Sequence, residues 1–188
     1  MSGGSSSAAV LVGGAVCTQH PDADQHGART TLDLMVDAAR AAAADALATD
    51  GPGVDRLLGE VAWVGVPEGT WPAPDPGRLV ADALGLAGSV PTVWAAVGVT
   101  QQELIASAVA AVADGARAAL VVGGEAKARR RLLERAGTPA SEIETAQHPD
   151  AVPTVAMRPG DLGVDAQVDE LAASLAAVTS PGDTVLME

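Results

Sequence analysis

The side chains of this sequence that could do chemistry lie at the ends of its apolar segments. Cys17 and His20 follow the apolar run 8–16 and stand three residues apart, so a thiol and an imidazole could act there as nucleophile and base. Both lie on one short polar loop without evident oxyanion donors, and small cysteines are often simply buried. We therefore interpret Cys17 as structural.

The segment 92–109, TVWAAVGVTQQELIASAV, predicts a strand, a tight turn and a helix. A sharp strand-to-helix turn often carries a nucleophile, because it exposes one side chain above the N–H groups at the start of the helix. Residues 95–99 are Ala, Ala, Val, Gly and Val, which include neither Cys nor Ser. The turn is therefore predicted to lack a catalytic residue of its own.

Two other motifs suggest binding of an anion. VGG occurs at 12–14 and 122–124, each time after a predicted strand, where glycines could admit a phosphate at a helix N-terminus. Neither matches a dinucleotide-binding or P-loop motif, so we interpret both as structural turns. The basic run KARRR, 127–131, could meet an acidic ligand such as the 3′-phosphate of CoA, but we favour a solvated helix face.

Metal binding is not expected. A zinc site is improbable with one Cys and three scattered histidines, which are His20, His26 and His148. The single cysteine also excludes a disulfide within the chain. Trp71, in the Pro-rich stretch 68–77, could cover a cleft or simply pack, and the sequence leaves both readings open.

Composition narrows the classes of function. The chain has 188 residues, a formal net charge of −13, and three Trp without any Phe or Tyr. Nucleic acid is disfavoured as a partner, because a phosphate backbone requires clustered Lys and Arg, and an anionic membrane surface is disfavoured by the same charge. The sequence lacks both the basic start of a signal peptide and a run of the ~20 apolar residues that span a bilayer. We expect a cytoplasmic protein.

Apolar runs alternate with segments of helical periodicity. The run 31–48 places Leu32, Met35, Val36, Ala39 and Ala43 on one helix face. The other predicted helices are 77–86, 100–113 and 125–137, and the predicted buried strands are 8–16, 61–67, a strand starting at 92, and 118–124. This alternation predicts an α/β fold with a mostly parallel sheet and helices on both faces.

The domain organisation is predicted as three parts. Residues 1–7 are a Gly/Ser-rich flexible tail, and 8–137 form the α/β lobe. Residues 138–188 are a divergent C-terminal extension, in which we expect a short strand within 152–158, a helix over 164–178 and a final strand over 183–188.

Four stretches together resemble the N-terminal half of thiolase-like proteins, nearest to acetyl-CoA acetyltransferases and sterol-carrier-type thiolases. They are LVGGAVCTQHPDAD, ARTTLDLMVDAARAAAADA, VAWVGVPEGTWPAPDPGRLVADALG and VGVTQQELIASAVAAVADGARAALVVGGEA. The resemblance covers roughly residues 8–137, in the order and spacing of that family. It implies a fold of two similar halves about a pseudo-twofold axis, usually dimeric, with acyl-CoA as substrate.

The resemblance also implies a Cys nucleophile on the turn of the first half, with a His and a second Cys from the second half. Here the turn maps onto 95–100 and has no Cys, Cys17 matches no catalytic position, and no second half follows. Conventional thiolase chemistry would then be lost. The resemblance leaves a remnant pocket of backbone N–H groups facing a thioester carbonyl, lined by Gly98, Val99, Thr100 and Gln101.

Three hypotheses follow from these features. The first is a thiolase-like acyl-CoA-binding or scaffold subunit that has no cofactor and no covalent catalysis and acts with a partner chain. The second is an acyltransferase or acyl-CoA retro-aldolase that is active only in a complex, with an Asp or Glu at a strand end or on the partner as acid or base. The third is a decaying gene product that folds without activity. For the first two we expect an exposed apolar surface, covered by a second copy or by a companion thiolase-like or small OB-fold subunit.

Overall fold

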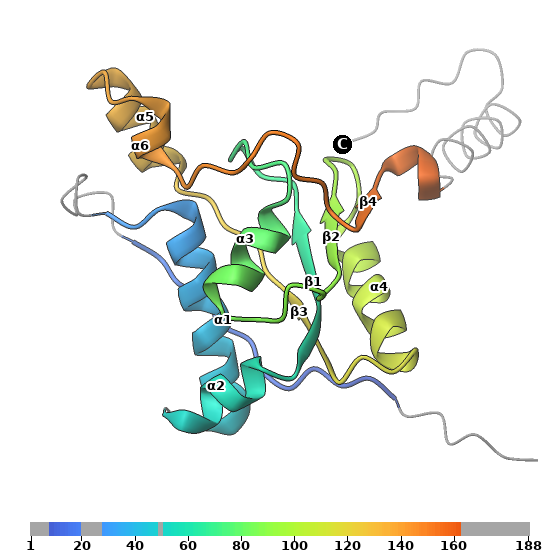
Figure 1. The fold of residues 1–188 in the computed structure, drawn as a ribbon. Coiled ribbons are helices and arrows are strands. Elements are labelled where there is room, and N and C mark those ends of the chain that lie inside the picture. The colour runs from blue at the N-terminus through green and yellow to red at the C-terminus, as the bar shows by residue number, and fades with distance from the viewer. Residues whose placement is uncertain (1–7, 20–27, 49–50, 163–188) are drawn as a thin grey trace, which may run out of the picture.

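The structure is a computed structural model that describes residues 8–19, 28–48 and 51–162 (Figure 1). Within these residues, four parallel strands form one sheet in the order β3-β1-β2-β4. The strands are β1 (Val61–Pro67), β2 (Thr92–Ala95), β3 (Ala118–Val121) and β4 (Val155–Met157). The helices are α1 (Thr31–Leu47), α2 (Pro52–Leu58), α3 (Pro76–Ala83), α4 (Gln101–Ala113), α5 (Lys127–Arg135), α6 (Ala140–Ile143) and the short 3₁₀ helix η1 (Pro159–Leu162).

Helices cover both faces of the sheet, which confirms the predicted α/β fold with a parallel sheet. In Figure 1, α1, α2 and α3 lie on one side of the strands and α4 lies on the other. The first side holds the larger core, in which apolar side chains of α1, α2 and α3 pack on Val64 and Val66 of β1. The second core joins Trp63 of β1 to Leu104 and Ala108 of α4.

Both ends of helix α1 are capped by local interactions. Thr30 and Asp33 form a reciprocal capping box, in which each side chain accepts a hydrogen bond from the backbone N–H of the other residue. The helix ends at Leu47, and the left-handed backbone of the following residue, Ala48 (φ 52°), caps the last turn. Most of the predicted core face is buried: Leu32, Met35, Ala39 and Ala43 are buried, and Val36 is partly buried.

The predicted strand over 8–16 is wrong. Residues 8–19 form neither helix nor strand, and Val10, Leu11, Val12 and Val16 are exposed. A strand exists only where its backbone pairs with a neighbour, and this segment pairs with none of the described strands. The apolar composition of residues 8–16 therefore indicated a propensity for strand structure, but the segment forms no strand with the described residues.

Other boundaries differ in ways that proline and glycine explain. Helix α2 is absent from the predicted helices; Pro52 begins it, at a position near the helix start where the missing N–H of proline costs no hydrogen bond. Strand β3 ends at Val121, and α5 begins at Lys127 rather than at residue 125, because Gly123 and Gly124 form the connection.

Part of the predicted extension belongs to the same sheet. Strand β4, inside the stretch 152–158 where a short strand was expected, pairs in parallel with β2 through Val93 and Val155. The expected tail 1–7, helix 164–178 and strand 183–188 lie outside the described residues.

We predict that the core around α4 contributes strongly to stability. Leu104 is fully buried (0% exposed), whereas Leu132 on α5 is 42% exposed. Leu104→Ala should lower the free energy of unfolding by about 2–5 kcal/mol, because it removes buried methyl groups and leaves a cavity. The matched Leu132→Ala should change it by about 0.5 kcal/mol or less. Urea denaturation followed by circular dichroism measures both, and equal losses would contradict this packing.

Candidate functional site

The carboxyl ends of β1 and β2 bring two loops together, which is where open parallel sheets usually bind ligands. Glu68 follows β1 directly, and the turn 96–100 joins β2 to α4. The backbone N–H of Glu68 donates to the carbonyl of Ala95 (2.6 Å). In return, the N–H of Val97 donates to the Glu68 carboxylate (2.7 Å). A negative charge therefore lies against the turn.

Gly98 gives the turn its shape. Its φ is +98°, a backbone conformation that residues with a side chain rarely adopt. A Cβ at this position would stand 2.8 Å from Cγ of Pro159, which lies in η1. The N–H of Ala96 also donates to the carbonyl of Met157 (2.9 Å), so the segment after β4 closes one side of the turn. Glycine is required here by both conformation and space.

The four residues predicted to line an N–H pocket do lie together, but two of their N–H groups are already used. Val99 N–H donates to the carbonyl of Ala96 (3.0 Å). Thr100 N–H donates to the Glu103 carboxylate (2.9 Å), as part of a capping box that starts α4. Gly98 and Gln101 keep N–H groups without a partner among the described residues. The turn therefore has two N–H groups without a recorded acceptor, and Val97, Gly98 and Thr100 are exposed.

The other sequence candidates lie elsewhere. Cys17 is half-buried, and its proposed partner His20 lies outside the described residues. His148 is exposed beside Asp150, and the described part of the chain contains no group of three or more side chains arranged to hold a metal ion. Trp71 is buried in the larger core, so the packing reading applies to it.

Two arginines of the basic run 127–131 bind other parts of the fold. Arg129 is buried and donates to the backbone carbonyls of Ala28 (2.9 Å) and Ile143. Arg130 donates to the carbonyl and hydroxyl of Thr70. Lys127 and Arg131 are exposed. The expectation of one solvated helix face thus applies to part of the run, while Arg129 joins three segments of the chain.

Sequence reasoning missed a set of buried carboxylates that tie the loops to the lobe. Glu144 accepts hydrogen bonds from the N–H (3.0 Å) and the hydroxyl (2.9 Å) of Thr31 at the start of α1. Asp75 is buried, accepts from the Thr92 hydroxyl (2.9 Å), and caps α3. Gln147 exchanges two hydrogen bonds with the backbone of Asp75. No short motif announces these pairs, since their members are far apart in sequence.

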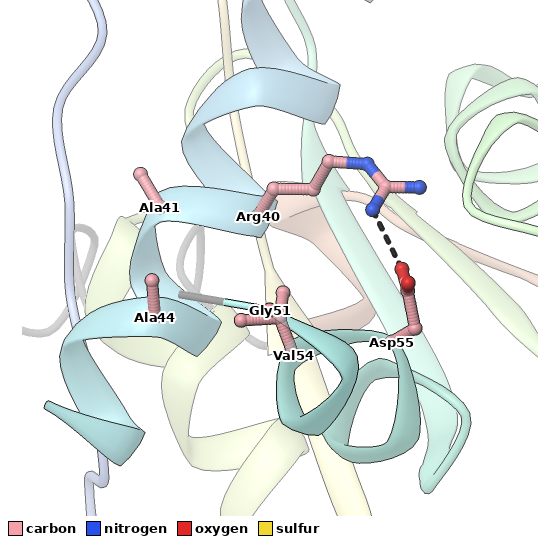
Figure 2. Close-up of a pocket in the computed structure, with 6 residues that line it drawn as sticks. All are labelled: Arg40, Ala41, Ala44, Gly51, Val54 and Asp55. Carbon is pink, nitrogen blue, oxygen red and sulfur yellow. Dashed lines mark hydrogen bonds and ion pairs between the residues drawn. The ribbon is translucent and has the colours of Figure 1, made fainter. Parts of the chain in front are cut away.

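A hollow of about 340 Å³ lies between α1 and α2 (Figure 2). Its lining residues are Arg40, Ala41, Ala44, Gly51, Val54 and Asp55. The Arg40 guanidinium spans it and pairs with the Asp55 carboxylate at 2.7 Å, as the dashed line in Figure 2 marks. Because these charges neutralise one another and the remaining lining is aliphatic or backbone, the hollow offers no reactive group.

A second depression lies at the carboxyl ends of the strands, beside Trp71, Trp94 and Gly124, and its volume is about 10 Å³. That is the room of about one water molecule. The turn 96–100 is a strand end that combines a carboxylate, that of Glu68, with two backbone N–H groups that have no partner among the described residues, those of Gly98 and Gln101.

Among the described helices, none has the length and apolarity that crossing a membrane requires. No protein-family model, no curated protein and no solved structure matches this chain.

We predict that Gly98 is required for the turn. Gly98→Ala should lower the free energy of unfolding by more than about 1 kcal/mol, because alanine is strained at positive φ and its Cβ would press on Pro159. The control is Gly88→Ala, where an added Cβ meets nothing within 4 Å. Thermal or urea denaturation compares the two variants. If both behave alike, the turn does not have the conformation described.

Proposed function

We propose that this chain is a thiolase-like subunit that binds acyl-CoA without covalent catalysis and works with a partner chain. The observation that carries the proposal is the turn between β2 and α4. It presents the N–H groups of Gly98 and Gln101 at the carboxyl end of a parallel sheet and carries no nucleophile. A thioester carbonyl oxygen is an acceptor that two N–H donors on one turn would suit.

The polarity of the turn supports binding rather than acyl transfer. Two N–H groups polarise a thioester carbonyl, but without a thiolate no acyl-enzyme forms. The helix N-terminus adds partial positive charge at the same point. The Glu68 carboxylate, held by Val97 N–H, opposes a full negative charge on the oxygen. The site is therefore suited to a neutral carbonyl.

The exposed face of α4 supports the part of the proposal in which the chain binds a partner chain. Ile105 and Val109 are exposed on this helix, and Val97 is exposed just before it. The only charged residue of α4 is Glu103, which is used in the capping box. An uncharged apolar face on a chain of formal net charge −13 favours coverage by another polypeptide. The proposal includes the companion subunit and the cytoplasmic location expected from the sequence.

The decisive experiment removes one N–H donor and leaves the helix in place. Gln101 is the first residue of α4, where proline is well tolerated, and Thr100 already has the extended backbone (φ −73°, ψ 151°) that a following proline requires. In calorimetric titration with acetyl-CoA, Gln101→Pro should weaken binding roughly 2- to 12-fold, the value of one net hydrogen bond. Gln101→Ala keeps the N–H and serves as the control.

Intact-mass spectrometry after incubation with acetyl-CoA should find no added acetyl group. Equal affinities of Gln101→Pro and Gln101→Ala would remove the turn as the binding site. An acetyl adduct on the chain would overturn the claim of noncovalent action.

A second candidate function is favoured by Glu68. Its carboxylate lies at a strand end beside the N–H pocket, where the acid or base of an acyltransferase or acyl-CoA retro-aldolase would be needed. In the retro-aldol direction, Glu68 would take the proton of a 3-hydroxyl group, the C2–C3 bond would break to release an aldehyde, and the N–H groups would hold the enolate oxygen until C2 is protonated. In the native complex, Glu68→Gln should abolish such turnover and leave acetyl-CoA binding intact, because Gln can still accept from Val97 N–H.

A further inference from the structure

Strand β3 lies at one edge of the sheet. Among residues 8–19, 28–48 and 51–162, it pairs with β1 alone. Val122 N–H, just after β3, donates to the carbonyl of Gly65 in β1 (3.0 Å). Because backbone groups alternate in direction along a strand, the N–H and C=O groups of Ala119 and Val121 point away from β1. They have no partner among the described residues.

Strand β3 is short, with four residues, but it carries neither of two features that commonly protect a sheet edge, a charged side chain and a proline. Residues 118–121 are Ala, Ala, Leu and Val. None of them is fully buried, and Val121 is 37% exposed. An apolar, uncharged edge is a template for adding another strand.

The same chain carries an apolar extended segment that also lacks a strand partner. In residues 8–16, the side chains of Val10, Leu11, Val12 and Val16 are between 63% and 93% exposed. The composition of this segment predicts a strand, yet among the described residues its backbone makes a single recorded hydrogen bond, from Gly14 N–H to the Asp45 carboxylate (3.0 Å).

The segment is held against α1 at one point. A Cβ on Gly13 would stand 2.2 Å from the carbonyl oxygen of Ala42, so the backbone there touches the helix directly. Val10, Leu11 and Val12, which precede Gly13, are exposed. Among the described residues of one chain, therefore, neither the segment 8–16 nor the outer edge of β3 has a strand partner.

We propose that the open edge of β3 binds the segment Ala9–Val12 of a second copy of this chain as an added strand. Four residues of the donor, AVLV, match the four residues of β3, AALV, in length and apolar character. If two copies exchange these segments about a two-fold axis, each segment pairs with the β3 edge of the other copy. Both edges and both segments then have strand partners.

The charge of the chain permits a second copy as the occupant at this surface. Two chains of formal net charge −13 repel each other, and an uncharged contact surface keeps that repulsion smallest. Residues 8–16 and 118–121 carry no charged side chain. This surface is separate from the turn 96–100, so the inference does not depend on acyl-CoA binding.

Cross-linking identifies the donor strand and the chain it comes from. Cys17 is the only cysteine, so a Cys17→Ser background is free of thiols. One preparation carries Leu11→Cys and the other carries Val121→Cys, and the two are mixed and treated with a short bismaleimide. The expected product is a cross-linked pair containing one chain of each kind. A Val121→Cys thiol that gives no such pair overturns the proposal, as it would if residues after 162 of the same chain covered the edge.

A second experiment uses one chain that carries both Leu11→Cys and Val121→Cys in the Cys17→Ser background. At low concentration, an intramolecular cross-link in a monomer would overturn the proposal in favour of the chain's own segment. Cross-linking that appears only between chains supports it.

Light scattering tests the energetic consequence. Leu11→Lys should raise the dimer dissociation constant at least roughly tenfold, because a charge would enter the new strand pair. Val152→Lys, at a site that is 77% exposed on another segment, is the matched control and should leave it unchanged. Both positions are exposed in the single chain, so folding is preserved. A wild-type monomer at high concentration, or equal effects of the two variants, would refute strand exchange.

Discussion

The burial of β1 on both faces is the constraint on which the rest of the molecule depends. Val64 is fully buried on the side of α1, α2 and α3, and Trp63 is buried on the side of α4. A strand covered on both faces must have neighbours on both edges, because its backbone groups have no access to water. Strands β2 and β3 satisfy β1, and their parallel direction places three strand ends at the same edge of the sheet. The meeting of Glu68 with the turn 96–100 follows from that geometry.

The cores around this sheet consist mainly of small side chains. Hydrogen bonds between polar groups fix the loops that bury little apolar area. Without Phe or Tyr, the cores use mainly Ala, Val and Leu around two Trp, Trp63 and Trp71. Segments that contribute little apolar surface are joined to the lobe by hydrogen bonds, buried ones between Thr31 and the Glu144 carboxylate and part-buried ones between Gln147 and the backbone of Asp75. A buried polar group is costly to leave without a partner, so these bonds fix each loop in one place.

Local signals in the sequence predicted what is local in the fold. Helical periodicity located α1 and α4, and apolar runs located β1, β2 and β3. The strand 8–16 could not be predicted correctly from its residues, since strand formation depends on a pairing partner that composition does not reveal. Arg129 was indistinguishable from its basic neighbours, because its role is set by carbonyls of Ala28 and Ile143 that are distant in sequence.

At the candidate site too, local features were predictable from the sequence and long-range contacts were not. Gly98 and the strand-to-helix turn were evident from the sequence, and the spacing of Thr100 and Glu103 is that of a capping box. That capping box decides the chemistry of the turn, because a helix N-terminus that uses its own carboxylate has fewer N–H groups left for a ligand. Glu68 could not be placed at the turn from sequence alone, since the pairing of β1 with β2 brings it there. A turn with two free donors, an adjacent carboxylate and no thiolate can hold a carbonyl group, but it lacks the nucleophile needed to form an acyl-enzyme.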